Sequence, residues 1–210
     1  MSVRIKICGI NDTAALDAAV EAGADWIGLV FFPPSPRFVT PAQAAALAAR
    51  HPDGPARVGL FVDPTAEQVE AVLAAVPLDV LQLYGAADAA ALRARFGRTV
   101  WRAAGIDSAG DLPIDAGGAD ALVLEAKPPP DSTRPGGNAA RFDWSVLRGW
   151  QAPAPWILAG GLTPDNVAEA ISSTGAAAVD VSSGVERSRG VKDPALIRAF
   201  IANARRASES

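Results

Sequence analysis

The sequence predicts one α/β domain that spans residues 1–210 and folds as a (β/α)8 TIM barrel. Three observations carry this prediction. Eight short apolar runs recur along the chain, Ala- and Leu-rich segments with helical spacing separate them, and no low-complexity linker divides the sequence. A chain of 210 residues is long enough for one substantial core. A doubly wound open sheet would show the same alternation, and counting strands does not exclude it.

The eight apolar runs are the expected strands. Several of them are apolar almost throughout, as is typical of parallel strands that are covered on both faces. The expected strands are residues 3–8, 26–31, 57–61, 80–83, 100–103, 121–125, 156–159 and 178–181.

Capping residues mark the expected helices between these strands. A capping side chain precedes a proline, the preferred pair for starting a helix, at Thr40-Pro41, Thr163-Pro164 and Asp193-Pro194. Thr65 and Gln68 fit a capping box. Gly23, Gly118 and Gly175 each open a similar phrase that leads into a strand, and glycine suits the end of a helix.

The composition excludes several classes of function. A net charge of -4 argues against a nucleic-acid surface, which needs clustered Lys and Arg. One cysteine and one histidine exclude an intrachain disulfide and the usual zinc clusters. The longest apolar run, residues 26–32, is too short to cross a bilayer, and no signal-peptide pattern opens the chain. We therefore expect a cytoplasmic protein with no membrane or nucleic-acid partner.

Few polar side chains stand at the carboxyl ends of the expected strands, where TIM barrels carry their active sites. We expect the substrate to contact some of these strand-end residues, namely Lys6, Arg37, Gln82 and Asp180. The loops after the last two strands contain Gly160-Gly161 and Ser182-Ser183-Gly184. Glycines let backbone N–H groups approach an anion, so the two loops together predict a phosphate site, although a Gly-Gly pair alone is often a plain turn.

Cys8, the single cysteine, lies at the end of the first expected strand. A lone cysteine on a strand is often a small buried hydrophobe. Lys6, two residues earlier, would point the same way into the barrel mouth, and a nearby ammonium lowers the pKa of a thiol. Both readings stand at this point, a buried packing residue and a reactive thiol.

Glu125 ends an otherwise apolar strand, so its carboxyl would emerge into the same mouth as Cys8. A thiolate and a carboxylic acid can act together as base and acid. Arg37 suits a substrate carboxylate, which matches a guanidinium in two-point contacts. Each residue also has an ordinary reading, as a solvated charge and as a surface arginine after a turn.

These residues occur in phrases that resemble those of the phosphoribosylanthranilate isomerases of tryptophan biosynthesis. The resemblance runs from residue 6 to about residue 201, and its combination of phrases is specific. The phrases are "KICGI", "GLVFFPPSPR", "VGLFVD", "LQLYG", "GGN…FDW", "LAGGLTPDNV", "VDVSSGVE" and "KDPALIRAFI".

The resemblance implies a (β/α)8 barrel that catalyses an Amadori rearrangement without metal or organic cofactor. N-(5-phosphoribosyl)anthranilate would become 1-(2-carboxyphenylamino)-1-deoxyribulose 5-phosphate. It implies that Cys8 is the general base, that Glu125 stands at the position of the general acid, and that Arg37 holds the anthranilate carboxylate. The phosphate would be held by Gly160, Gly161, Ser182, Ser183 and Gly184. The partner would be this small phosphorylated substrate, and the protein would be a monomer or homodimer.

The chain departs from the family pattern at three positions. Glu125 replaces the usual aspartate, Tyr84 replaces a histidine, and Ala139 replaces a glycine. The added methylene of Glu125 shifts the acid by roughly 1 Å, and a shift of that order can cost about 10²-fold in rate. The alternatives are a slower isomerase, a site rearranged around the longer arm, a non-catalytic binder, and a related phosphosugar enzyme.

Overall fold

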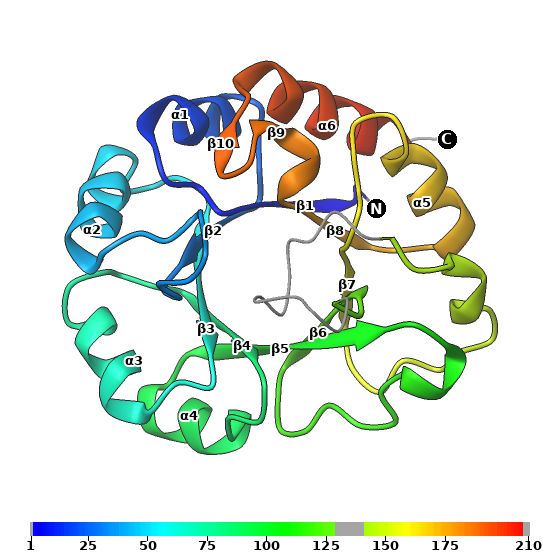
Figure 1. The fold of residues 1–210 in the computed structure, drawn as a ribbon, viewed down its shortest axis with the longest axis horizontal. Helices are drawn as coiled ribbons and strands as arrows, with labels where there is room; N and C mark the ends of the chain where they lie inside the picture. Colours follow the sequence, from blue (N-terminus) through cyan, green and yellow to red (C-terminus); the bar gives the residue numbers. More distant parts are fainter. Residues whose placement is uncertain (1, 129–140, 208–210) are drawn as a thin grey trace.

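Eight parallel strands form a closed barrel in the computed structural model, which describes residues 2–128 and 141–207 (Figure 1). Strands pair in chain order, and β1 closes the ring against β8 through register pairs such as Lys6 with Asp180. The TIM-barrel prediction is confirmed, and the open-sheet alternative is excluded. The strands are β1 Arg4–Cys8, β2 Trp26–Val30, β3 Ala56–Val62, β4 Val80–Tyr84, β5 Thr99–Ile106, β6 Ala121–Ala126, β7 Trp156–Leu158 and β8 Ala178–Val181.

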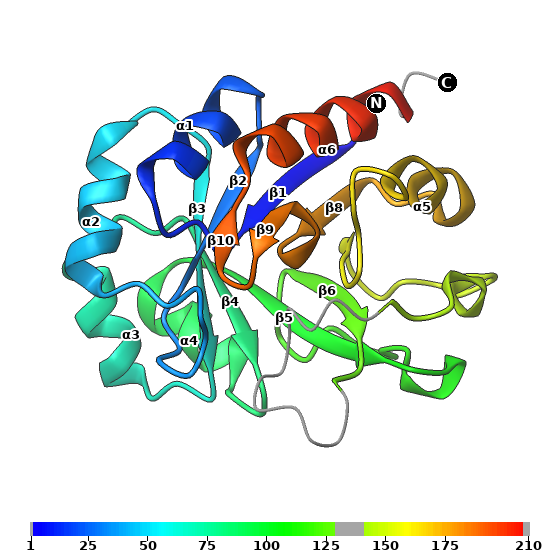
Figure 2. The same ribbon diagram turned by 45° about the horizontal axis from the view of Figure 1, so that its top comes forward.

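Helices surround the barrel as an outer ring (Figures 1 and 2). The connection from β5 to β6, all of it described, contains the 3-10 helix η1 Ala109–Asp111 instead of an α-helix. The described part of the connection from β6 to β7 contains the 3-10 helix η2 Trp144–Leu147. The α-helices are α1 Thr13–Glu21, α2 Pro41–Arg50, α3 Ala66–Leu73, α4 Ala89–Phe96, α5 Val167–Thr174 and α6 Pro194–Ala207.

Two of the expected capping signals act as predicted at their helix starts. Thr40 and Thr65 each form a complete capping box with the glutamine three residues later. A third signal, Asp193, accepts a hydrogen bond from the backbone N–H of Ala195 at 2.8 Å as α6 begins. These caps supply acceptors for N–H groups that the first helical turn leaves without a partner.

Two of the expected helix boundaries are wrong. Thr163-Pro164 does not start α5, which begins at Val167. The preceding turn is closed by Asn166, whose Oδ1 accepts from the backbone N–H of Thr163 at 2.8 Å. Gly118 adopts a positive φ in a turn before β6 and ends no helix, because η1 ends seven residues earlier.

The barrel interior forms one core, and the space between barrel and helices forms a larger one. Trp26 and Trp101 meet edge to face inside the barrel near the amino ends of their strands, with ring centroids 5.1 Å apart. Cys8 belongs to this inner core, and Lys6 is completely buried. Both side chains therefore point inward, as their two-residue spacing predicts.

A short antiparallel hairpin follows β8 and lies beside β1 and β8 in both views (Figures 1 and 2). It consists of β9 Glu186–Ser188 and β10 Val191–Lys192. Within the described ranges, every helix is too short or too polar to cross a membrane.

Candidate active site

A buried chain of polar side chains crosses the interior of the barrel. The Lys6 Nζ donates to Asp180 Oδ2 and to Gln82 Oε1, both at 2.7 Å. The Gln82 Nε2 then donates to the hydroxyl of Tyr84 at 3.0 Å. Strands β1, β8 and β4 are thus joined by a network whose central members, Lys6 and Gln82, are fully buried.

Lys6 keeps its charge inside the barrel. Burial opposes the ammonium, but the Asp180 carboxylate and other nearby acidic groups outweigh that cost and raise the pKa of Lys6 above its ordinary value. One oxygen of Asp180, Oδ1, is buried and has no hydrogen-bond partner among the residues that the structure describes. Such an acceptor can accept a hydrogen bond from a hydroxyl group of a bound molecule without breaking the contact to Lys6.

The thiol of Cys8 lies beside this network. Burial raises the pKa of Cys8, and the cations Lys6, Lys192 and Arg37 oppose this effect without cancelling it. The expectation of a net lowered pKa for the thiol is therefore wrong. Lys6 does act in the expected sense, but desolvation disfavours the thiolate more strongly.

A glycine in the neighbouring strand makes room for the thiol. Gly28 pairs with Cys8 across β1 and β2, and a Cβ atom there would lie 3.0 Å from the sulfur. Any side chain larger than the hydrogen of glycine at this position would force the sulfur or its neighbours to shift.

Glu125 is the penultimate residue of β6, across the barrel from β1, and 6% of its surface is exposed. The Tyr84 hydroxyl lies close enough to the Glu125 carboxyl for a side-chain hydrogen bond. Burial raises the pKa of Tyr84 well above its ordinary value, and the charges of Glu125, Cys8 and Asp180 add to this shift. Tyr84 therefore stays protonated, and two carboxyls and one thiol, from β6, β8 and β1, all raise its pKa.

Arg37 is buried and paired with Glu186 of β9. The Arg37 Nε contacts Glu186 Oε1 at 2.6 Å, and Nη2 contacts Oε2 at 3.0 Å. The guanidinium edge formed by Nε and Nη2 is thus engaged by a protein carboxylate. A two-point contact with a second carboxylate requires the other edge, formed by Nη1 and Nη2. The reading of Arg37 as a plain surface arginine is excluded.

The two predicted phosphate loops lie side by side. Gly160 and Gly161 both have positive φ, at 79° and 64°. In the neighbouring loop, a Cβ atom on Gly184 would lie 1.8 Å from the carbonyl oxygen of Leu162. Ser182 and Ser183, in the loop that contains Gly184, are half-buried. The prediction that these two loops lie together is confirmed. Ala139 lies outside the described residues.

This close approach predicts a stability effect. Gly184→Ala is expected to lower the free energy of unfolding by about 1–3 kcal/mol, the usual cost of an overpacked site. The matched control is Gly110→Ala in η1, where the nearest atom to an added Cβ lies 3.7 Å away. Chemical denaturation of both variants checks this. Equal stabilities for the two variants would contradict the packing of the two loops.

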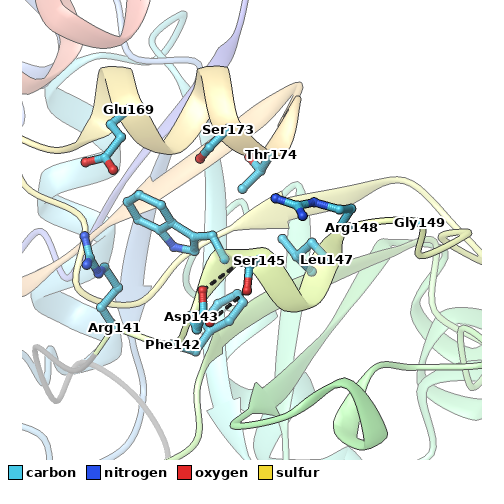
Figure 3. A pocket seen from close by; sticks show the side chains of 11 residues that line it. Arg141, Phe142, Asp143, Ser145, Leu147, Arg148, Gly149, Glu169, Ser173 and Thr174 are labelled. Atoms are coloured by element: carbon cyan, nitrogen blue, oxygen red, sulfur yellow. Dashed lines mark hydrogen bonds between the residues drawn. The ribbon is translucent and has the colours of Figure 1, made fainter.

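A separate pocket lies outside the barrel mouth, between η2 and α5 (Figure 3). Its volume is about 600 Å³, and Arg141, Asp143, Ser145 and Glu169 are among the residues that line it. It contains none of the predicted site residues. Its position outside the barrel mouth thus separates it from the thiol and carboxyl in the barrel.

Sequence reasoning missed two members of the site, Glu186 and Lys192. Glu186 holds Arg37, and the Lys192 Nζ contacts Glu186 Oε1 at 2.9 Å and the carbonyl oxygen of Ser182 at 2.8 Å. Glu186 follows directly on the "VDVSSGV" stretch, and this position was the available signal. Nothing in its spacing indicates a partner 149 residues earlier.

The class of protein follows from where these groups lie. Charged and nucleophilic side chains collect at the carboxyl ends of strands over a packed interior, which is the arrangement of TIM-barrel enzymes. Comparison with known proteins gives the particular family. The sequence model described as N-(5'phosphoribosyl)anthranilate (PRA) isomerase matches residues 5–203.

Individual relatives agree with this match. The N-(5'-phosphoribosyl)anthranilate isomerase of Granulibacter bethesdensis is 54% identical over 209 residues, covering 99% of this chain and 100% of that protein. The structure of dimeric phosphoribosylanthranilate isomerase from Thermotoga maritima, as mutually generated monomers, has a TM-score of 0.78 and 34% identity, covering 96% of this chain and 98% of the other.

A second solved relative carries a ligand. It is a phosphoribosylanthranilate isomerase in complex with reduced 1-(o-carboxyphenylamino)-1-deoxyribulose 5-phosphate. The TM-score is 0.79 at 33% identity, and the match covers 96% of this chain and 98% of that chain. This chain belongs to the phosphoribosylanthranilate isomerases, the isomerase family of tryptophan biosynthesis.

Proposed function

We propose that this chain converts N-(5-phosphoribosyl)anthranilate to 1-(2-carboxyphenylamino)-1-deoxyribulose 5-phosphate, with Glu125 as general acid and Cys8 as general base. The observation that supports this most is the shared surroundings of the two groups. Cys8 of β1 and Glu125 of β6 are both buried within the barrel, and the charge of each raises the pKa of Lys6 and of Tyr84 there.

The reaction needs one proton donor and one proton acceptor. Protonated Glu125 gives its proton to the ribose ring oxygen as the bond from that oxygen to C1 breaks, and the nitrogen lone pair forms a C1=N bond. The Cys8 thiolate then removes the proton on C2, the electron pair of that C–H bond forms a C1=C2 bond, and the electron pair of the C1=N double bond returns to nitrogen. Protonation at C1 and loss of the C2 hydroxyl proton complete the ketone. No external oxidant or reductant is needed, because C1 is reduced as C2 is oxidised.

The polar network beneath these two groups supports sugar binding. We propose that Asp180 Oδ1 accepts a hydrogen bond from a hydroxyl group of the sugar, and that Lys6 and Gln82 form the floor of the binding site. The hydrogen bonds of Lys6 to both Asp180 and Gln82 fix this floor before any substrate arrives. Preorganised groups of this kind bind without paying for their own ordering.

The two ends of the substrate would be held at two anion sites. Arg37 would bind the anthranilate carboxylate, and the phosphate would bind to Gly160, Gly161, Ser182, Ser183 and Gly184. The expected partner is this small phosphorylated substrate, and the expected assembly is a monomer or homodimer.

Turnover of phosphoribosylanthranilate by the purified protein tests the proposal. Chromatography should detect the deoxyribulose product without added metal or cofactor. Binding of the reduced product analogue by calorimetry, with no product formed over a long assay, would instead identify a non-catalytic binder.

Tyr84→Phe tests how Glu125 is held. The variant removes the hydroxyl group that accepts a hydrogen bond from Gln82 and that lies beside the Glu125 carboxyl. We expect kcat to fall about tenfold, the effect of about 1.4 kcal/mol from one lost hydrogen bond. The Michaelis constant should stay within about twofold, because the phosphate and carboxylate ends are untouched. An unchanged kcat in steady-state assays would show that Tyr84 does not position the acid.

A further inference from the structure

A buried group of three charged side chains lies beside the barrel mouth: Arg37, Glu186 and Lys192. Arg37 is 4% and Lys192 2% exposed, and the Glu186 side chain is 4% exposed. Glu186 Oε1 is shared by the Arg37 Nε at 2.6 Å and the Lys192 Nζ at 2.9 Å, while Oε2 receives the Arg37 Nη2 at 3.0 Å. One carboxylate thus fixes two cations.

The hairpin backbone fixes Glu186 in turn. The Gly190 N–H donates to Glu186 Oε2 at 3.0 Å, and Gly190 has a φ of 82°. A Cβ atom on Gly190 would lie 2.7 Å from the carbonyl oxygen of Pro36, so the turn packs directly on the segment that carries Arg37. Burial disfavours the ionised form of Glu186, but Arg37, Lys192 and the Gly190 N–H outweigh it and lower the pKa to about 2.

The two cations held by Glu186 contact different parts of the barrel mouth. The stem of Arg37 packs on Gly9, where an added Cβ would lie 2.5 Å from the Arg37 Cδ, and Gly9 directly follows Cys8. The Lys192 Nζ donates to the carbonyl oxygen of Ser182 at 2.8 Å. A continuous line of contacts therefore joins the end of β1 to the loop after β8.

We propose that Glu186 is a positioning residue that fixes the distance and orientation between the two anion-binding ends of the substrate site. It holds the guanidinium of Arg37 for the aryl carboxylate, and through Lys192 it anchors the loop at Ser182 that would receive the phosphate. This inference rests on the proposed function, because it takes the substrate to carry an anionic group at each end.

The chemistry of the group favours such a role over a purely stabilising one. Burying three charges costs desolvation, and well-packed apolar residues are commonly as stabilising as a buried ion pair. A planar guanidinium held along one edge by a carboxylate is instead fixed in rotation, so its other edge keeps a defined direction. Substrate binding gains from such a preset geometry.

Steady-state kinetics of Glu186→Gln with two substrates test the proposal. The second substrate is the phosphoribosyl derivative of aniline, which lacks the aryl carboxylate. For phosphoribosylanthranilate we expect KM to rise about tenfold or more with kcat within about threefold, because a charge-assisted contact to Arg37 is weakened. For the aniline derivative, which keeps only the phosphate end, KM of the variant should rise by about threefold or less, because only the loop anchored through Lys192 is disturbed.

A matched control is Glu21→Gln, which breaks the exposed contact of Glu21 to Arg198 at 2.8 Å, outside the site. Its kinetic constants should equal those of the parent protein. If Glu186→Gln does not fold, as judged by thermal melting, Glu186→Asp keeps the charge and shortens the reach. It should show the same selective rise in KM to a smaller degree.

The outcomes separate this inference from the proposed function. Equal rises in KM for both substrates, or no rise for either, would overturn the positioning role while turnover by the parent protein stands. Absence of turnover in the parent protein would instead refute the proposed function itself.

Discussion

Cys8→Ser is expected to lower kcat for phosphoribosylanthranilate by about 10²–10⁴-fold, the usual contribution of a positioned general base. A serine hydroxyl has nearly the same size as a thiol but does not ionise in the working pH range of an enzyme. Affinity for the reduced product analogue should change little, because the proposed anion sites at Arg37 and at the two glycine loops are untouched. Steady-state assays and calorimetry on the same preparation measure both quantities.

The pH profile adds a second signature of the thiol. Burial raises the pKa of Cys8, so the thiolate fraction grows as pH rises through and above the ordinary thiol value of about 8.5. We expect kcat to be still increasing at that pH in the parent protein and this limb to be missing in Cys8→Ser. If Cys8 is only a packing residue, Cys8→Ser would lose stability, keep its turnover and keep the same profile.

Glu125→Gln is expected to lower kcat by a similar factor of about 10²–10⁴, because an amide is a far poorer proton donor than a carboxylic acid. Glutamine has nearly the same shape and can still contact the Tyr84 hydroxyl. Stability and ligand affinity should therefore remain close to those of the parent protein. Full activity in Glu125→Gln would remove Glu125 from the mechanism.

Glu125→Asp distinguishes the two explanations of the longer acid. We expect it to lower kcat by up to about 10²-fold, because the carboxyl retracts by roughly 1 Å from its place beside Tyr84. That result would mean that the site is built around glutamate, with Tyr84 in contact with it. A higher kcat in Glu125→Asp would mean that Glu125 is itself a misplaced acid and that this chain is a slower isomerase.

The fold could be predicted from sequence because its signals are local. Apolar runs, capping pairs such as Thr40-Pro41 and the box at Thr65 each act within a few residues. The predicted start of α5 failed because a nearby side chain formed the hydrogen bond that a helix cap would otherwise form. Asn166 caps the backbone N–H of Thr163 and moves the start of α5 to Val167.

The site was predictable only in part, because its members come from distant segments. Strand-end position correctly placed Lys6 and Asp180 together, since both face the barrel interior from neighbouring strands. Strand-end position did not indicate the partner of Arg37, because Glu186 comes from a hairpin 149 residues away. The pKa of Cys8 was also beyond sequence reasoning, because burial and charge oppose each other there and only the packed structure shows which is larger.

The central claim is that the sulfur of β1 and the carboxyl of β6 flank one bound sugar. A crystal structure of this chain with the reduced deoxyribulose phosphate analogue, the ligand of the solved relative, tests it most directly. We expect the Cys8 sulfur about 3–3.5 Å from C2 and the Glu125 carboxyl beside the C4 hydroxyl, which derives from the ring oxygen. An analogue bound with C2 facing away from Cys8, or with Glu125 out of reach of that hydroxyl, would contradict it.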